Sequence, residues 1–133
     1  QIFSISCYCC GYIMALYNHL PVYKASYDLL VKIFELTRNF SREYKYTLGE
    51  SIKKEAIEMI TNIYRANSSY DKKDKIQAAR ENIEVIRLYF RLVKDLRQIS
   101  LKSFVEVNEK IEMVSKQLTG WGNSLKFTLW NKF

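Results

Sequence analysis

The sequence predicts an all-α protein that folds as an antiparallel, up-down four-helix bundle. The 133 residues include only 4 glycines and 1 proline, so few positions force the backbone out of a helical conformation. Apolar residues recur every three or four positions in four successive stretches, which is the spacing of one buried helix face. Helices joined by short loops pack as antiparallel neighbours, and the simplest arrangement of four such helices is the up-down bundle.

The first helix is expected to begin at Pro21, because proline suits the first turn of a helix. Two neighbouring apolar stripes are expected to form one wide buried face. The first is Val22, Leu29, Ile33, Leu36 and Phe40, and the adjacent one is Tyr23, Tyr27, Leu30 and Phe34. A polar and basic loop follows from Asn39 to Tyr46. The pattern therefore predicts one buried helix face and then a solvated connection.

The second helix is expected to begin at a capping box, Thr47-Leu48-Gly49-Glu50. In such a box the Thr47 hydroxyl and the Glu50 carboxylate each bind a free backbone amide of the first turn. The helix is expected to stop at Asn67-Ser68-Ser69. Its apolar positions step by four or three residues through Leu48, Ile52, Ala56, Met59, Ile63 and Ala66.

The third and fourth helices complete the predicted bundle. The third is the longest, from about Asp71 to Gln98, and Ser100 is the expected cap of the fourth. The fourth is expected to end at Gly120 and Gly122, because glycine is favoured just past a helix C-terminus. Its apolar positions also step by three or four residues, through Leu101, Phe104, Val107, Ile111, Val114, Leu118 and Trp121.

The chain is predicted to have three parts: an N-terminal extension (1–19), the bundle (20–121) and a basic, aromatic tail (122–133). Residues 1–23 carry no charged side chain, and much of this segment is apolar. We interpret residues 1–13 as non-native upstream sequence before a natural start at Met14. The alternatives are a membrane or signal segment and a native arm. A membrane span is disfavoured because the segment lacks a basic flank and runs into polar residues.

No catalytic, metal or cofactor site is expected, so the protein is predicted not to be an enzyme. The three cysteines, Cys7, Cys9 and Cys10, are clustered, and the only histidine, His19, lies off any usual zinc-ligand spacing. The sequence has no phosphate-binding glycine loop and no Glu-x-x-His pair of a di-metal bundle. The lack of cysteine elsewhere suits a reducing cytoplasm, which is the predicted location.

The third helix carries a cationic row, Arg80, Arg87, Arg91 and Lys94. At 100° per residue these side chains fall within an arc of about 60°, with Glu84 as the only acid inside it. Arginine binds phosphate through two parallel hydrogen bonds, and a formal net charge of +7 favours polyanionic partners. The cationic row is therefore predicted to contact the phosphates of RNA or DNA.

Two other interpretations of the cationic row stay open. It could be an ordinary solvated face paired with acids of neighbouring helices, or it could make salt bridges between subunits. If the row is only a solvated face, the nucleic-acid assignment moves to the basic loop that contains Arg38, Arg42 and Lys45, or is dropped. Outside the row the third helix is apolar nearly all round. A bundle needs fewer buried positions than this, so the excess predicts self-association, with a wide monomeric core as the alternative.

Several segments carry a resemblance to a known family. They are Leu20-Pro21-Val22-Tyr23-Lys24, Tyr27-Asp28-Leu29-Leu30, Tyr46-Thr47-Leu48-Gly49-Glu50-Ser51-Ile52, Ala66-Asn67, the segment from Arg87-Leu88 to Leu96, and Thr119-Gly120-Trp121. From about Leu20 to Trp121 the chain resembles the accessory variability determinant family of diversity-generating retroelements. That family is akin to the four-helix-bundle proteins encoded in intervening sequences of bacterial large ribosomal RNA genes.

The resemblance implies a pentameric barrel of four-helix bundles. It also implies a basic surface that binds RNA or DNA without strong sequence choice, and a partnership with the retroelement reverse transcriptase. In that system template RNA is copied into mutated cDNA, which replaces a variable region of a target gene. Two other functions remain open: a ribosomal-RNA intervening-sequence protein, and a structural helical oligomer that binds no nucleic acid.

Overall fold

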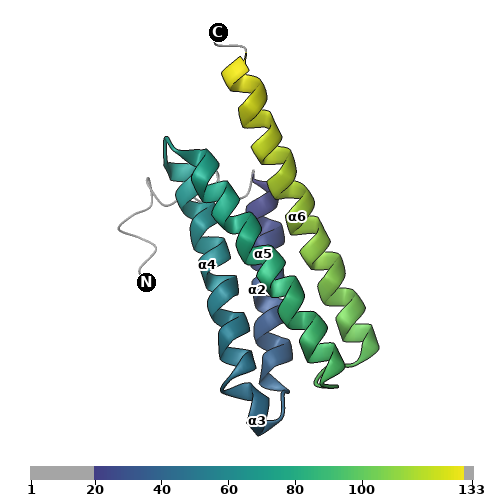
Figure 1. Ribbon diagram of the computed structural model, residues 1–133. Helices are drawn as coiled ribbons and strands as arrows, with labels where there is room; N and C mark the ends of the chain where they lie inside the picture. The colour runs from purple at the N-terminus through teal and green to yellow at the C-terminus, as the bar shows by residue number, and fades with distance from the viewer. Residues whose placement is uncertain (1–19, 131–133) are drawn as a thin grey trace, which may run out of the picture.

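The computed structural model describes the backbone of residues 20–130 and the side chains of residues 20–125. Four long helices run side by side in alternating directions: α2 (Pro21–Arg38), α4 (Leu48–Ser68), α5 (Lys72–Asp95) and α6 (Leu101–Trp130) (Figure 1). A short helix, α3 (Arg42–Lys45), lies between α2 and α4. No strand occurs in the part of the chain that is described. The predicted all-α class is thus confirmed, and the helices form a bundle.

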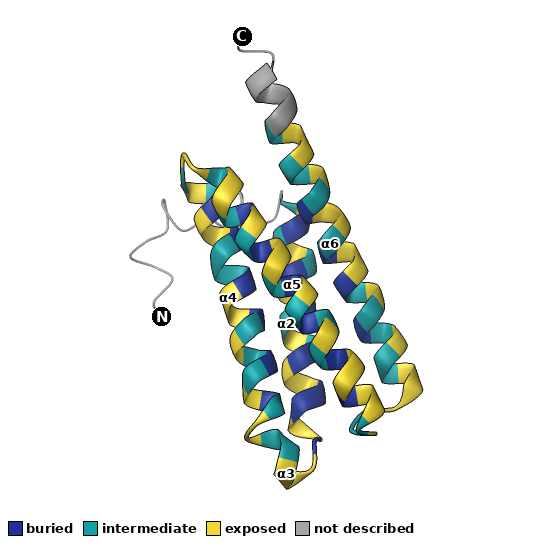
Figure 2. Ribbon diagram, viewed as in Figure 1, coloured by how far each residue is buried: buried dark blue, intermediate teal, exposed yellow. Residues whose placement is uncertain are grey.

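The four long helices enclose one continuous apolar core (Figure 2). Consecutive helices pack against each other, and α2 also packs against α6, so the bundle is closed. The first predicted stripe of α2 and the predicted apolar steps of α4 are buried apart from Leu48, which is half-buried. The second predicted stripe of α2 is not buried as expected, because Tyr23 and Leu30 are half-buried and Tyr27 and Phe34 are exposed. The largest fully enclosed side chains come from all four helices and include Leu29, Ile33, Ile52, Met59, Ile83, Phe90, Ile111 and Leu118.

The capping box predicted at the start of α4 is wrong. Thr47 has φ −113° and ψ −82°, and its side chain makes no cap hydrogen bond. Its hydroxyl instead donates to the carbonyl oxygen of Glu43 at 3.1 Å. Glu50 pairs with Lys53, with 2.6 Å between Oε1 and Nζ. The unexpected helix α3 explains the difference, because it places a backbone acceptor four residues before the threonine.

At the junction between α5 and α6, α5 ends at Asp95, before the predicted end at Gln98, and α6 rather than α5 is the longest described helix. Arg97 adopts a positive φ of 57°, the left-handed conformation that commonly ends a helix. Ser100 Oγ accepts a hydrogen bond from the backbone N–H of Ser103 at 3.1 Å. The predicted cap of the fourth helix is therefore confirmed.

The predicted end of the fourth helix is wrong, because α6 continues through Gly120 and Gly122 to Trp130. Neither glycine has a positive φ, so neither uses the conformation that would end the helix. A glycine inside a helix costs about 1 kcal/mol relative to alanine. Trp121 and Leu125 pack against the core, and this burial offsets that cost. The last turns of α6 extend past the neighbouring helices (Figure 1).

An ion pair links the first and last long helices. Lys32 Nζ donates to Glu106 Oε2 at 2.8 Å. This hydrogen bond, followed by the positive charge of Lys32, holds the pKa of Glu106 below its usual value. Because the pKa is lowered in the folded state, the contribution of the pair to stability is present at neutral pH. That contribution is lost as the pH falls through the lowered pKa.

Residues 1–19 lie outside the described residues, and so does their interpretation as upstream sequence. The same holds for the side chains of Phe127 and Trp130 and for residues 131–133 of the tail. Among the described residues, no helix combines the length and the apolar character needed to cross a membrane.

Candidate nucleic-acid interface

The cationic row follows the side of α5 that faces α6, but the structure divides it between different grooves. Arg87, Arg91 and Lys94 line one groove of about 740 Å³, together with Phe104 and Asn108 of α6. Arg80 lies apart and lines two smaller pockets closer to the start of α5. Three of the four predicted residues are therefore brought together.

Acids share the groove with these three cations. Glu84 and Asp95 of α5 and Glu112 of α6 also line it, so the formal charges of its lining cancel. Arg87 is held between two carboxylates, with Nη1 2.8 Å from Glu112 Oε1 and Nη2 3.6 Å from Glu84 Oε1. The groove therefore offers a phosphate a nearly neutral surface.

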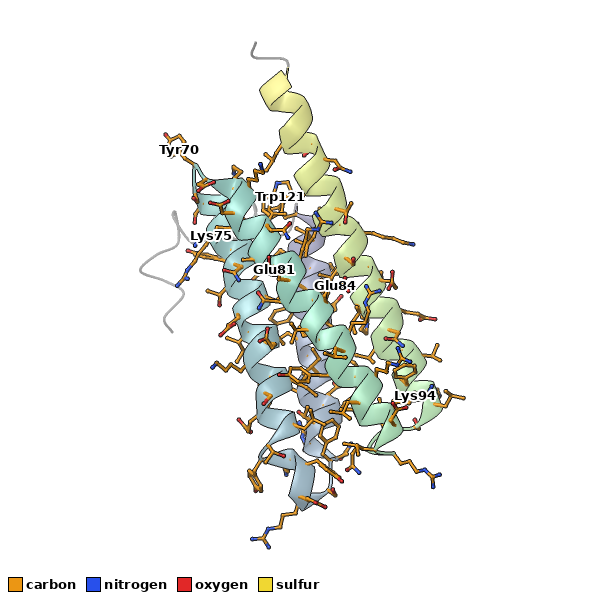
Figure 3. The ribbon with its side chains drawn as sticks, viewed as in Figure 1. Tyr70, Lys75, Glu81, Glu84, Lys94 and Trp121 are labelled. Carbon is orange, nitrogen blue, oxygen red and sulfur yellow. The ribbon has the colours of Figure 1, made fainter. Side chains whose placement is uncertain are left out.

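The remaining members of the row are less engaged. Lys94 Nζ lies 4.8 Å from the centroid of the Phe104 ring, a cation–π contact that leaves its charge uncompensated. Figure 3 shows Lys94 toward the end of α5, well away from Glu84. Arg80 and Arg91 are exposed and make no ion pair among the described residues. Phosphate binding by the cationic row thus stays a prediction, with Arg80, Arg91 and Lys94 as its exposed members.

A second group of cations meets at the end of the bundle that α3 closes. Arg38 ends α2, Lys45 ends α3, and Lys53 lies near the start of α4. These three side chains line one pocket of about 210 Å³ with Phe34 and Thr37. We call it the basic pocket. No acid lines it, in contrast to the groove of the cationic row.

The basic pocket contains two of the three residues predicted in the basic loop. Arg42 is exposed on α3 and does not line the pocket. Lys53 was missed by sequence reasoning, because it lies on the next helix and outside the basic run. Because Glu50 and Lys53 are three residues apart on one helix, the sequence predicts only an ordinary surface ion pair. No sequence signal therefore pointed to the pocket.

Two contacts position the basic pocket. The backbone N–H of Ser41 donates to Gln98 Oε1 at 2.9 Å, which ties the α2–α3 connection to the turn between α5 and α6. Lys53 Nζ lies 5.6 Å from the centroid of the Phe34 ring while it pairs with Glu50. Arg38 and Lys45 make no ion pair among the described residues. The pocket can therefore present two uncompensated cations to an anion.

Neither surface resembles a metal centre. No cluster of three or more potential metal-ligating side chains occurs among the described residues. The expectations that the protein has no cofactor and is not an enzyme stay predictions.

Comparison with known proteins gives the family. A family model described as bAvd-like matches residues 21–125. No curated protein matches the chain significantly. The matched region spans well over half of the chain and contains both the cationic row and the basic pocket. The chain therefore belongs to the bAvd-like family, and at the level of the family it is an accessory protein of a diversity-generating retroelement.

Proposed function

We propose that the protein is a non-enzymatic, nucleic-acid-binding accessory of a diversity-generating retroelement. It binds RNA and DNA with little sequence preference and associates with the reverse transcriptase. In this way it supports synthesis of the mutated cDNA and its return to the target gene. Family membership supports the general role, and the net charge of +7 supports a polyanionic partner.

The observation that carries the proposal is the basic pocket. Three helices each contribute one cation to it, and no acid lines it. The groove of the cationic row has as many acids as cations in its lining. Backbone phosphates bind mainly through their charge, so the basic pocket is the stronger phosphate site. Secondary phosphate contacts come from Arg42 on α3 and from Arg80, Arg91 and Lys94 along α5.

Self-association into a ring of five subunits is part of the same proposal. Leu88 and Leu92 lie one turn apart on α5, and the exposed fractions of these residues are 66% and 45%. Two large exposed aliphatic side chains on one helix favour a subunit contact. Light scattering of the full chain is expected to give a mass near five times 15.8 kDa. A monomer at micromolar concentration would contradict the ring.

The test of nucleic-acid binding compares two charge reversals of equal size. Arg38→Glu with Lys45→Glu removes the two uncompensated cations of the basic pocket. Arg91→Glu with Lys94→Glu makes the same change of charge in the groove of the cationic row. Arg87 is left intact, because its reversal would break the contacts with Glu84 and Glu112 and disturb the fold as well.

We expect the pocket variant to bind RNA and DNA about tenfold more weakly, while the row variant loses less. Affinity decreases as salt increases, because each phosphate contact releases counterions. For the pocket variant, the slope of log affinity against log salt should become less steep by about two. Filter binding at several salt concentrations measures both quantities, and circular dichroism checks that helicity is kept. A larger loss in the row variant would move the site to α5. No binding by the wild type at low salt would leave a purely structural oligomer.

A further inference from the structure

An exposed aromatic ring borders the basic pocket. Phe34 lines the pocket although the exposed fraction of this residue is 42%. Single exposed apolar residues are common on proteins, but here the ring adjoins two uncompensated cations. That combination is typical of surfaces that bind single-stranded nucleic acid, where cations follow the backbone and aromatic side chains receive the bases.

Phe34 lies at the border between two different hollows. On one side is the basic pocket, with Arg38 and Lys45. On the other side is a hollow between α2 and α4, where the apolar lining is Phe34 and the half-exposed Ile57. Its charged lining is Glu50, Lys53, Lys54 and Glu58, so two carboxylates and two ammonium groups balance each other there. An anionic group and a flat apolar group could thus be bound next to each other. A nucleotide carries both groups on one small unit.

A double helix cannot use both hollows in this way. Its phosphates are accessible, but its bases stack on each other inside the duplex and offer no free face to a side chain. A single strand presents the phosphate and an unstacked base together. The contact between Lys53 and the Phe34 ring also places one cation beside the ring.

We propose that the basic pocket and Phe34 together form a binding site for single-stranded nucleic acid. A phosphate lies against Arg38, Lys45 and Lys53, and an adjacent base stacks on Phe34. The inference rests on the proposed nucleic-acid function and names its preferred ligand: single-stranded RNA or DNA over duplex.

The test is Phe34→Leu in the full chain, because leucine keeps an apolar side chain and a high helix propensity but has no ring. Fluorescence anisotropy would compare a short oligoadenylate with a duplex of the same length. We expect affinity for the oligoadenylate to fall about tenfold, as for the loss of one stacked base, while affinity for the duplex is unchanged. Phe34→Tyr should bind both ligands as the wild type does.

Tyr70→Leu is the matched control, since this residue is a fully exposed aromatic far from α3, in the connection between α4 and α5 (Figure 3). It should bind both ligands normally. Unchanged oligoadenylate affinity in Phe34→Leu would overturn the inference, and so would an equal loss for the duplex. A changed oligomer mass in this variant would assign Phe34 to a subunit contact and also overturn it.

Failure of the inference can be distinguished from failure of the proposed function. If Arg38→Glu with Lys45→Glu leaves binding of both ligands intact, the basic pocket is not the phosphate site and both proposals fail. If that variant loses both ligands but Phe34→Leu loses neither, the phosphate site stands and only base stacking is rejected.

Discussion

Replacing Phe90 with alanine is expected to lower the free energy of unfolding by about 3 to 5 kcal/mol. Phe90 is 0% exposed and lies on α5, which packs against both α4 and α6. Removal of the ring would leave a cavity that neighbours on two sides cannot fill without losing their own contacts. Urea unfolding followed by circular dichroism measures the change, at one protein concentration for all variants because assembly also affects stability.

Leu101→Ala is the control for this prediction. It also removes a large apolar side chain, but the exposed fraction of Leu101 is 68%. Surface substitutions usually change stability by less than about 0.5 kcal/mol. If Leu101→Ala destabilises as much as Phe90→Ala, burial of Phe90 in the core does not explain the loss and the prediction is wrong.

Replacing Trp121 with alanine is expected to lower the free energy of unfolding by about 2 kcal/mol, roughly half the value for a fully buried ring. The apolar spacing of the fourth helix predicts that Trp121 is the last apolar step of the bundle. The structure shows it packed against the core but only half-buried, near the point where α6 leaves its neighbours (Figure 3). The same urea experiment applies.

Met113→Ala on the same helix serves as the reference, since Met113 is 57% exposed. It is expected to change stability little. A Trp121→Ala variant no less stable than Met113→Ala would show that the tryptophan does not hold α6 to the bundle.

The sequence was sufficient to predict the four long helices, because each buries one continuous apolar face and the spacing of that face is visible along the chain. It did not predict α3, which has no buried residue and therefore no such face. Leu29 and Ile33, or Ile52 and Ala56, are one turn apart and buried. Helix ends were harder to predict. Gly120 and Gly122 are typical of a helix end. The burial of Trp121 and Leu125 outweighs the preference of these glycines for that position, and α6 continues past them.

The site was only partly predictable, because spacing along one helix does not show what a neighbouring helix places opposite. The arc containing Arg87 was correct for α5, but Glu112 comes from α6 and compensates that charge. The basic pocket was missed for the same reason, because its cations come from different helices. Arg38, Lys45 and Lys53 lie on three helices, and only the folded chain brings them to one place.

The contact between α2 and α6 has a consequence for how the chain folds. Lys32 and Glu106 are 74 residues apart, whereas the other long helices pack against the next long helix in the chain. Short connections close at a small entropic cost, so α4 and α5 are expected to pair early and α6 to close on α2 last. During synthesis, α2, α4 and α5 therefore emerge before the helix that completes their core. Until α6 leaves the ribosome, the inner faces of these three helices stay open to solvent and to chaperones.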